Sequence, residues 1–171
     1  MIQSMRTIAI YLILLFCGCA PAKPQGGEYQ QTLAKMIEQS DRIVVTEHSD
    51  QFDAFDANAG KSLIQSEIVY GTHELDASQK RLFLSTVRDL DPKLQNAFPL
   101  CIIEPHHSIR FYAGGKLTST MDICFKCGQV EWDATKATPP WSLYSGLETL
   151  ITAIGFSPKR DWSALAKQHL K

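Results

Sequence analysis

The chain has 171 residues, of which 44% are hydrophobic, and its 17 basic and 18 acidic residues give a formal net charge of -1 at neutral pH. Charge this balanced excludes the strongly basic surface of a nucleic-acid-binding protein and gives no sign of an acidic ligand. The length is that of one ordinary domain with a hydrophobic core.

Residues 1–18 have the three parts of an export signal. Arg6 stands in a polar start, an apolar run follows at 8–16, and small residues lead to Cys19. The apolar run is too short to cross a bilayer, which takes about 20 residues in a helix. We therefore expect cleavage before Cys19, and we expect residues 19–27, which are rich in proline and glycine, to form a flexible, lipid-anchored tether.

The end of this signal, Phe16-Cys17-Gly18-Cys19, resembles that of bacterial lipoproteins, whose signal peptidase cuts before a cysteine that carries lipid. The resemblance implies lipid on Cys19 and attachment to a membrane, because lipid chains bury their methylene groups in the bilayer. Ala20 follows the cysteine, which by similarity to Gram-negative lipoproteins implies the outer membrane, facing the periplasm. The alternative is an ordinary cleaved signal that contains two incidental cysteines.

Residues 28–171 alternate between helical and extended patterns. The predicted helices cover 29–37, a segment from Asp76 or Ser78 towards Leu94, a segment from Pro139-Pro140 to Gly155, and a last segment that Asp161 caps. The predicted strands cover 42–46, 63–73 and a hairpin at 100–127, with a loop at 47–61. This order predicts a single α+β domain, in which a mostly antiparallel sheet that includes the hairpin is covered by three or four helices.

Burial fixes the register of the hairpin, since the odd-numbered positions of both its strands are mostly apolar. These positions are Ile103, His107, Ile109 and Phe111 in the first strand, and Leu117, Met121, Ile123 and Phe125 in the second. Odd positions must pair with odd positions, because a slip by one residue would expose one set to water. A three-residue loop at 113–115, closed by Tyr112 and Lys116, gives this pairing, whereas a two-residue Gly114-Gly115 turn pairs odd with even.

In that register Cys101 lies opposite Cys127, on the same face as His107, and Cys124 joins them if the strand turns over there. If these four residues bind a metal, the site is tetrahedral and typical of zinc. In the oxidised alternative, Cys127 forms a disulfide with Cys101 or with Cys124, and one thiol is left over. Three cysteines remain beyond Cys19, and this odd number favours a metal site, because a disulfide alone leaves one thiol over. An oxidising compartment favours a disulfide, so both alternatives stay open.

The hairpin also carries a resemblance. Cys101 followed by Pro-x-His107, and Ile123-Cys124-Phe125-x-Cys127 on the second strand, resemble a group of uncharacterised bacterial exported proteins that share a Pro-x-His strand and an Ile-Cys-Phe-x-Cys strand. The resemblance implies that His107 rather than His106 belongs to the site. It implies no activity.

The sequence favours a bacterial envelope lipoprotein of unknown biochemical activity, whose Cys/His site in the hairpin is structural. One alternative is a thiol–disulfide redox module that uses Cys124 and Cys127. The segment after Cys127 has an extended pattern, which counts against this alternative because reactive Cys-x-x-Cys thiols sit at a helix N-terminus. The other alternative is a non-catalytic module for binding or assembly in the envelope.

The remaining histidines and tryptophans show no chemical pattern. We expect His48 and His73 at the surface, and His106 exposed opposite Asp122. We expect the tryptophans to pack where the helices meet the sheet: Trp132, Trp141 and Trp162.

Overall fold

The computed structural model describes residues 25–94 and 100–170, so the predicted signal, Cys19 and most of the predicted tether lie outside the described residues. The helices are α1 (Gln25–Gln39), α2 (Ala77–Arg88), α3 (Leu143–Ala153) and α4 (Trp162–His169). The strands are β1 (Arg42–His48), β2 (Phe55–Asp56), β3 (Lys61–Ser62), β4 (Val69–Glu74), β5 (His107–Ala113), β6 (Lys116–Cys124) and β7 (Gln129–Trp132). None of the helices in this part of the chain has both the length and the apolar composition that a membrane span needs.

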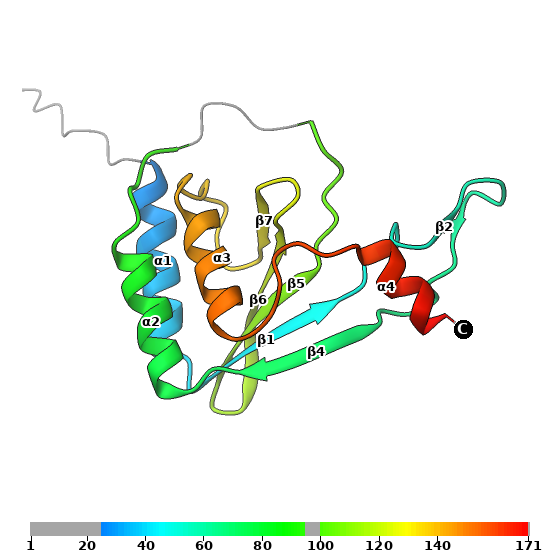
Figure 1. Ribbon diagram of the computed structural model, residues 1–171. Helices are drawn as coiled ribbons and strands as arrows, with labels where there is room; N and C mark the ends of the chain where they lie inside the picture. Colours follow the sequence, from blue (N-terminus) through cyan, green and yellow to red (C-terminus); the bar gives the residue numbers. More distant parts are fainter. Residues whose placement is uncertain (1–24, 95–99, 171) are drawn as a thin grey trace, which may run out of the picture.

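Five strands form one antiparallel sheet in the order β4-β1-β5-β6-β7, and β2 pairs with β3 in a separate two-stranded hairpin (Figure 1). Together with the helices, this sheet confirms the predicted α+β fold. Strand β1 is flanked by two strands from later in the chain, β4 and β5. The end of β1 therefore meets the beginning of β5, and this meeting point carries most of the buried polar residues described below.

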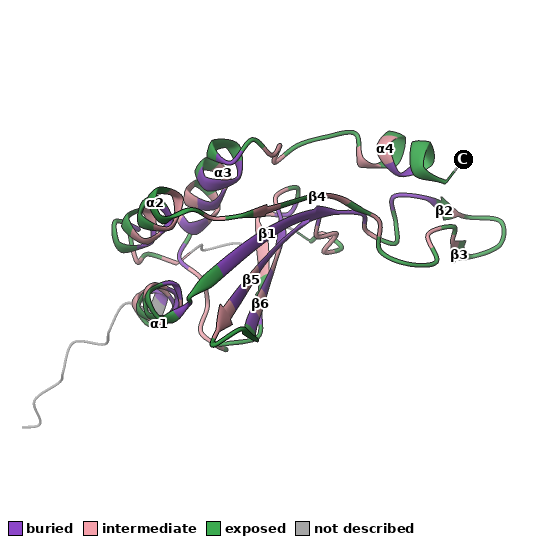
Figure 2. Ribbon diagram, turned by 90° about the horizontal axis from the view of Figure 1, so that it is seen from below, coloured by how far each residue is buried: buried purple, intermediate pink, exposed green. Residues whose placement is uncertain are grey.

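Helices α1, α2 and α3 cover one face of the sheet, and α4 lies apart from them near the end of β1 (Figure 2). The odd-numbered residues of β1 and β5, and those of β6 from Ser119 onward, point toward the three helices, since side chains alternate between the faces of a strand. The core includes Ile43, Val45, Ile109, Phe111, Met121 and Ile123 from the strands, and Leu33, Ile37, Phe83, Val87, Leu147 and Ile151 from the helices. Burial of these side chains is the main favourable contribution to folding, at roughly 25 cal/mol per Å² of apolar surface.

The β5–β6 hairpin keeps the predicted pairing of odd with odd residues from His107 to Phe111 but not next to the turn. There Leu117 lies opposite Tyr112 and is exposed, so its predicted place on the core face is wrong. Gly114 and Gly115 form a two-residue turn in which both have positive φ angles, 59° and 74°, so the expected three-residue loop is wrong. A β-bulge at Thr118 adds one residue to β6 and restores the pairing that this turn alone would break. As a result His107 lies opposite Ile123, two residues farther along β6 than expected.

Element boundaries differ from the prediction at three places. Helix α1 begins at Gln25, so the last residues of the predicted tether are helical. Strand β1 continues to His48, into the predicted loop, because Glu47 still pairs with a residue of β5. Strand β4 begins only at Val69, several residues later than expected.

The start of α1 packs against two prolines through Gly26. A Cβ atom at this position would overlap the carbonyl oxygen of Pro92 and would lie 3.0 Å from Cβ of Pro140. At the neighbouring Gly27, the nearest atom to an added Cβ would be Cβ of Pro92, 4.0 Å away, which is an ordinary contact. The first turn of α1 therefore has room for a side chain at one glycine but not at the other.

These two glycines make a matched test of the packing. We expect Gly26→Ala to lower the free energy of unfolding by about 1–3 kcal/mol, because the extra methyl group must displace the backbone of Pro92. Gly27→Ala is expected to be neutral or to stabilise by up to about 1 kcal/mol, since alanine favours the helix more than glycine does. Urea denaturation of both variants measures the difference, and equal effects would contradict the close packing at Gly26.

Candidate functional site

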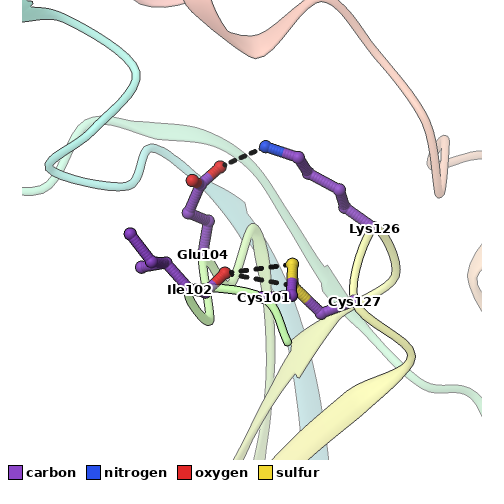
Figure 3. Close-up of a disulfide and its surroundings, with 5 residues drawn as sticks. All are labelled: Cys101, Ile102, Glu104, Lys126 and Cys127. Carbon is purple, nitrogen blue, oxygen red and sulfur yellow. Dashed lines mark hydrogen bonds and ion pairs between the residues drawn. A yellow bond between two sulfur atoms is a disulfide. The ribbon is translucent and has the colours of Figure 1, made fainter. Parts of the chain in front are cut away.

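Cys101 and Cys127 form a disulfide whose Cα atoms are 5.9 Å apart (Figure 3). That separation lies in the usual range for disulfides. Cys101 belongs to the segment before β5 and Cys127 to the turn between β6 and β7, so the bond joins the two ends of the hairpin. The structure therefore confirms one of the two predicted disulfide pairings. Nearby, Lys126 donates a 3.0 Å hydrogen bond to Glu104, a second link between the same two segments.

The four predicted metal ligands are not brought together. Cys101 and Cys127 are bonded to each other, and Cys124 is a free, completely buried thiol. Cys124 is the neighbour of Ile123, which lies opposite His107, so its side chain projects to the opposite face of the sheet from the imidazole. Within 25–94 and 100–170, no group of three or more histidine, cysteine, aspartate or glutamate side chains is placed to hold a metal ion. Zinc binding by these residues stays a prediction.

Three histidines gather instead where β1 ends and β5 begins; we call His48, His106 and His107 the histidine cluster. The β1–β5 ladder sets Glu47 opposite His107, and the amide of His48 donates to the carbonyl of His106. All three side chains are buried. Burial of His107 on the core face was predicted, whereas the expected exposure of His48 and His106 is wrong, because segments distant in the sequence cover them.

His107 is completely buried, and neither of its ring nitrogens has a hydrogen-bond partner among the described residues. Its Nε2 atom lies 3.6 Å from a carboxylate oxygen of Glu47, and the rings of Phe125 and Trp162 contact it edge-on at centroid distances of 5.2 and 5.6 Å. Burial, followed by the nearby positive charges of His106, His48 and Arg160, lowers the pKa of His107 to about 3. The ring is therefore neutral in the folded protein at physiological pH.

Glu47 is a buried carboxylate that the C-terminal segment neutralises. Arg160 Nε lies 3.1 Å from Glu47 Oε1, and the backbone amide of Ser157 donates to the same oxygen at 3.4 Å. A buried carboxylate without a partner costs several kcal/mol, so this pair fixes where the segment before α4 lies. Gly71 of β4 leaves room for the same segment, because an added Cβ at this position would lie 2.9 Å from the ring of Phe156.

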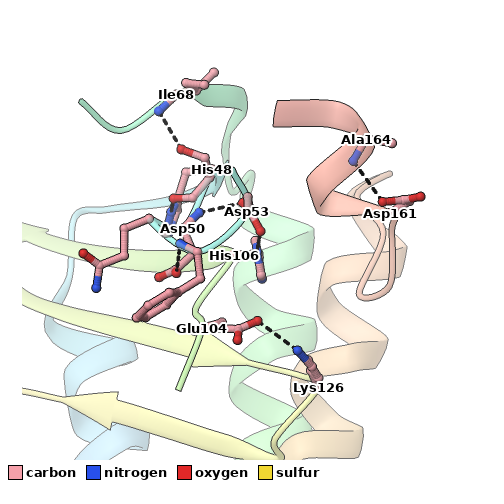
Figure 4. Close-up of polar contacts among 12 residues, drawn as sticks. His48, Asp50, Asp53, Ile68, Glu104, His106, Lys126, Asp161 and Ala164 are labelled. Atoms are coloured by element: carbon pink, nitrogen blue, oxygen red, sulfur yellow. Dashed lines mark hydrogen bonds and ion pairs between the residues drawn. The ribbon is translucent and has the colours of Figure 1, made fainter. Parts of the chain in front are cut away.

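His106 is held from two sides. Its Nε2 atom lies 2.8 Å from Oδ1 of Asp53, whose other oxygen accepts a hydrogen bond from the backbone amide of Asp50 (Figure 4). Its ring stacks on Trp162 of α4, with 4.4 Å between centroids and 7° between planes. Asp53 was expected in a solvated loop, but its partner His106 draws it into the interior.

His48 lies on the opposite face of the sheet, in a chain of polar groups. Ser108 donates to Asp122 at 2.6 Å, so its single hydroxyl proton is engaged and its oxygen accepts from Nε2 of His48 at 2.8 Å. This is not the arrangement of a hydrolase triad, because Asp122 contacts the serine rather than orienting the histidine. Ser108 is also buried, out of reach of a substrate.

A pocket of about 280 Å³ lies between the histidine cluster and the segment that leads into α4. His106 and His107 form one part of its wall, and the β6–β7 turn contributes Phe125 and Lys126. The remaining wall comes from the C-terminal segment: Pro158, Lys159, Arg160 and Trp162. The pocket thus combines the histidine predicted from the hairpin motif with residues that sequence reasoning assigned no role.

The sequence held one signal for this site that is not part of the cysteine motif. Glu47 comes two residues after Val45, the last of the apolar strand residues 43–45, and a carboxylate that continues a buried strand needs a partner. The partner, Arg160, is too distant in the sequence to be identified from spacing. Trp162 was expected at the junction of helices and sheet, but it stacks on His106 instead, and Trp141 is exposed. Only Trp132 packs as predicted, against Tyr29 of α1.

Comparison with models of protein families, with curated proteins and with solved structures found no match. Function is therefore inferred from the geometry of the site.

The disulfide is expected to stabilise the fold. For a sequence separation of 26 residues, the loss of unfolded-chain entropy is worth about 3.5 kcal/mol, so reduction should lower the free energy of unfolding by about that amount. Urea denaturation with and without dithiothreitol measures it. Cys124→Ala should retain the full effect of the reductant, and Cys101→Ala/Cys127→Ala should show none. Loss of the effect in Cys124→Ala would mean that Cys124 forms the bond.

The low pKa of His107 predicts a loss of stability in acid. The unfolded ring takes up a proton below about pH 6.5 and the folded ring does so only near pH 3, so the unfolded state gains about 1.4 kcal/mol per pH unit between these values. Between about pH 7.5 and about pH 5, the free energy of unfolding of the unaltered protein should fall by roughly 2 kcal/mol more than that of His107→Phe. The variant keeps an aromatic ring at this position but cannot titrate. His169→Gln, at the exposed end of α4, is the control. An unchanged pH dependence in His107→Phe would contradict the buried, neutral ring.

Proposed function

We propose that this protein is a non-catalytic binding module of the bacterial envelope, held to a membrane by lipid on Cys19, in which the Cys101–Cys127 bond has a structural role. The observation that carries the proposal is the pocket beside the histidine cluster. One of its walls is the β6–β7 turn, which the disulfide fixes in position. Another wall is the C-terminal segment, which the Glu47–Arg160 pair holds in place. A pocket whose walls are fixed before a ligand arrives is suited to binding.

The sulfur chemistry supports a structural role over a redox role. Cys127 is bonded to Cys101 and not to Cys124, so the Cys-x-x-Cys pair does not form a dithiol couple. Cys124 is completely buried, whereas the attacking thiol of a redox module must be reachable. Strand β7 begins at Gln129, one residue after the motif, so neither sulfur lies at a helix N-terminus, where reactive Cys-x-x-Cys thiols are found.

The polar groups of the site support binding over catalysis. The carboxylates of Asp53 and Glu47 are each paired within the protein, with His106 and Arg160, and Ser108 is buried. Among the described residues, both ring nitrogens of the buried His107 lack a hydrogen-bond partner, and aromatic rings contact this side chain edge-on. The arrangement holds a ligand-sized space open and offers no activated nucleophile beside it.

The placement of the anchor agrees with a binding role. The chain enters the domain at the start of α1, and both views show this point at the opposite end of the molecule from α4 (Figures 1 and 2). Lipid on Cys19 would therefore hold the domain by the end that is remote from the pocket. The pocket would then face the periplasm, where soluble ligands or partners diffuse.

Two cysteines separated by one residue, Cys17 and Cys19, test the anchor. We expect the mature protein to carry lipid on its N-terminal cysteine and to sediment with membranes. Cys19→Ala should abolish both properties, whereas Cys17→Ala should retain them, because Cys17 lies in the part of the signal that is removed. Mass spectrometry of the N-terminal peptide and fractionation of cells measure the outcome. A soluble, lipid-free protein with residues 1–18 removed would contradict the anchor and indicate an ordinary export signal.

A further inference from the structure

The pocket beside the histidine cluster has a charge that the balanced composition of the whole chain conceals. Three of its lining residues are basic, Lys126, Lys159 and Arg160, and none is acidic. The two histidines add no negative charge. The lining residues themselves therefore carry a positive charge that can attract an anion, although the net charge of the chain is only -1.

Each of these cations has a carboxylate partner but keeps free donors. Lys126 uses one hydrogen bond to Glu104, and Lys159 lies 3.9 Å from Glu148. An ammonium group has three donors, so at least two remain at each lysine. Arg160 contacts Glu47 through Nε, which leaves the two terminal amino groups of its guanidinium for a second acceptor. These two amino groups have the spacing that suits the two oxygens of a carboxylate.

Apart from the two histidines, the other lining residues are apolar or aromatic. They are Phe125, Pro158 and Trp162. At about 280 Å³ the pocket is slightly smaller than the sites that take drug-sized molecules. It suits one compact apolar group with one charged end, and it is too small for a polyphosphate nucleotide or a folded partner.

A second hollow on the protein has the opposite character. It has a volume of about 550 Å³, lies beside β7, and its ionisable side chains are three carboxylates, one lysine and one tyrosine: Asp122, Glu131, Asp133, Lys136 and Tyr29. An anion would be repelled there. The two hollows therefore provide an internal comparison for ligands of either charge.

We propose that the pocket binds a small organic acid, with its carboxylate against Arg160, Lys159 and Lys126 and its apolar body against Phe125 and Trp162. This assignment names the ligand class of the binding module proposed above and rests on that function. Recognition of the acid requires both parts of the ligand. The charged end makes charge-assisted hydrogen bonds, and the apolar end buries surface against the aromatic rings.

The test uses the full-length protein, expressed with its own signal and purified from whichever cell fraction holds it. Benzoate is the probe, because it has one carboxylate on one flat apolar ring. Benzyl alcohol supplies the ring without the charge, and inorganic phosphate supplies charge without the ring. Titrations are followed by the indole N–H signals of Trp162, in the pocket, and of Trp141, which is exposed at the start of α3.

We expect benzoate to shift the Trp162 signal in a saturable way and to leave Trp141 unchanged. Benzyl alcohol and phosphate should each bind at least tenfold more weakly, since each lacks one of the two required parts. Lys126→Ala/Lys159→Ala should weaken benzoate binding at least fivefold. Lys93→Ala is the control, because Lys93 is also an exposed lysine paired with a carboxylate, Asp91, but lies outside the pocket. Arg160 is left intact because it also neutralises Glu47.

Equal binding of benzoate and benzyl alcohol would overturn the proposal, as would parallel shifts of Trp162 and Trp141 or an equal effect of Lys93→Ala. The comparison of the three probes on the unaltered protein remains decisive even if the lysine variants fold poorly. These outcomes are independent of the anchor. A protein without lipid on Cys19 can still bind benzoate, and a lipid-anchored protein can fail to bind it.

Discussion

The pairing of β1 with β5 places a carboxylate, Glu47, directly opposite an imidazole, His107, inside the protein. A carboxylate in such a place must find a positive partner or be destabilising by several kcal/mol. Arg160 is that partner, and its position brings the C-terminal segment back over the end of the sheet. Trp162 then stacks on His106, and the space left between these side chains is the pocket. The site is thus a consequence of one buried charge and of the way it is neutralised.

The opposite wall depends on a different constraint. The Cys101–Cys127 bond fixes the β6–β7 turn against the segment before β5, and Phe125 and Lys126 belong to that turn. A covalent bond on one side and an ion pair on the other hold these two walls in place. The walls are therefore ordered before any ligand binds, which reduces the conformational entropy that binding would otherwise lose.

What could be predicted from the sequence is what local patterns determine. Alternation of apolar residues predicted the pairing of odd with odd positions in the hairpin. The same alternation placed Cys101 and Cys127 on one face of the hairpin, and the odd number of cysteines left a metal site or a disulfide as the alternatives. The structure contains one of the predicted disulfides, Cys101–Cys127. The turn was mispredicted because two glycines are compatible with loops of different length, and the bulge at Thr118 that compensates has no sequence signature of its own. Burial of His48 and His106 could not be predicted, because their partners approach only in three dimensions. Ser108 is the partner of His48, and Asp53 and Trp162 are the partners of His106.

The bond between Cys101 and Cys127 also turns β5, β6 and the glycine turn into a closed covalent ring. The tip of this ring, Gly114-Gly115, is exposed to solvent and is the kind of place where proteases cut. A single nick there would open the ring without releasing a fragment, because the disulfide and the ladders on both sides still join the pieces. Such a nicked protein would keep its apparent mass on a non-reducing gel and separate into two chains only after reduction. Wherever the protein meets proteases, the arrangement makes the hairpin tolerant of a cut at its exposed turn.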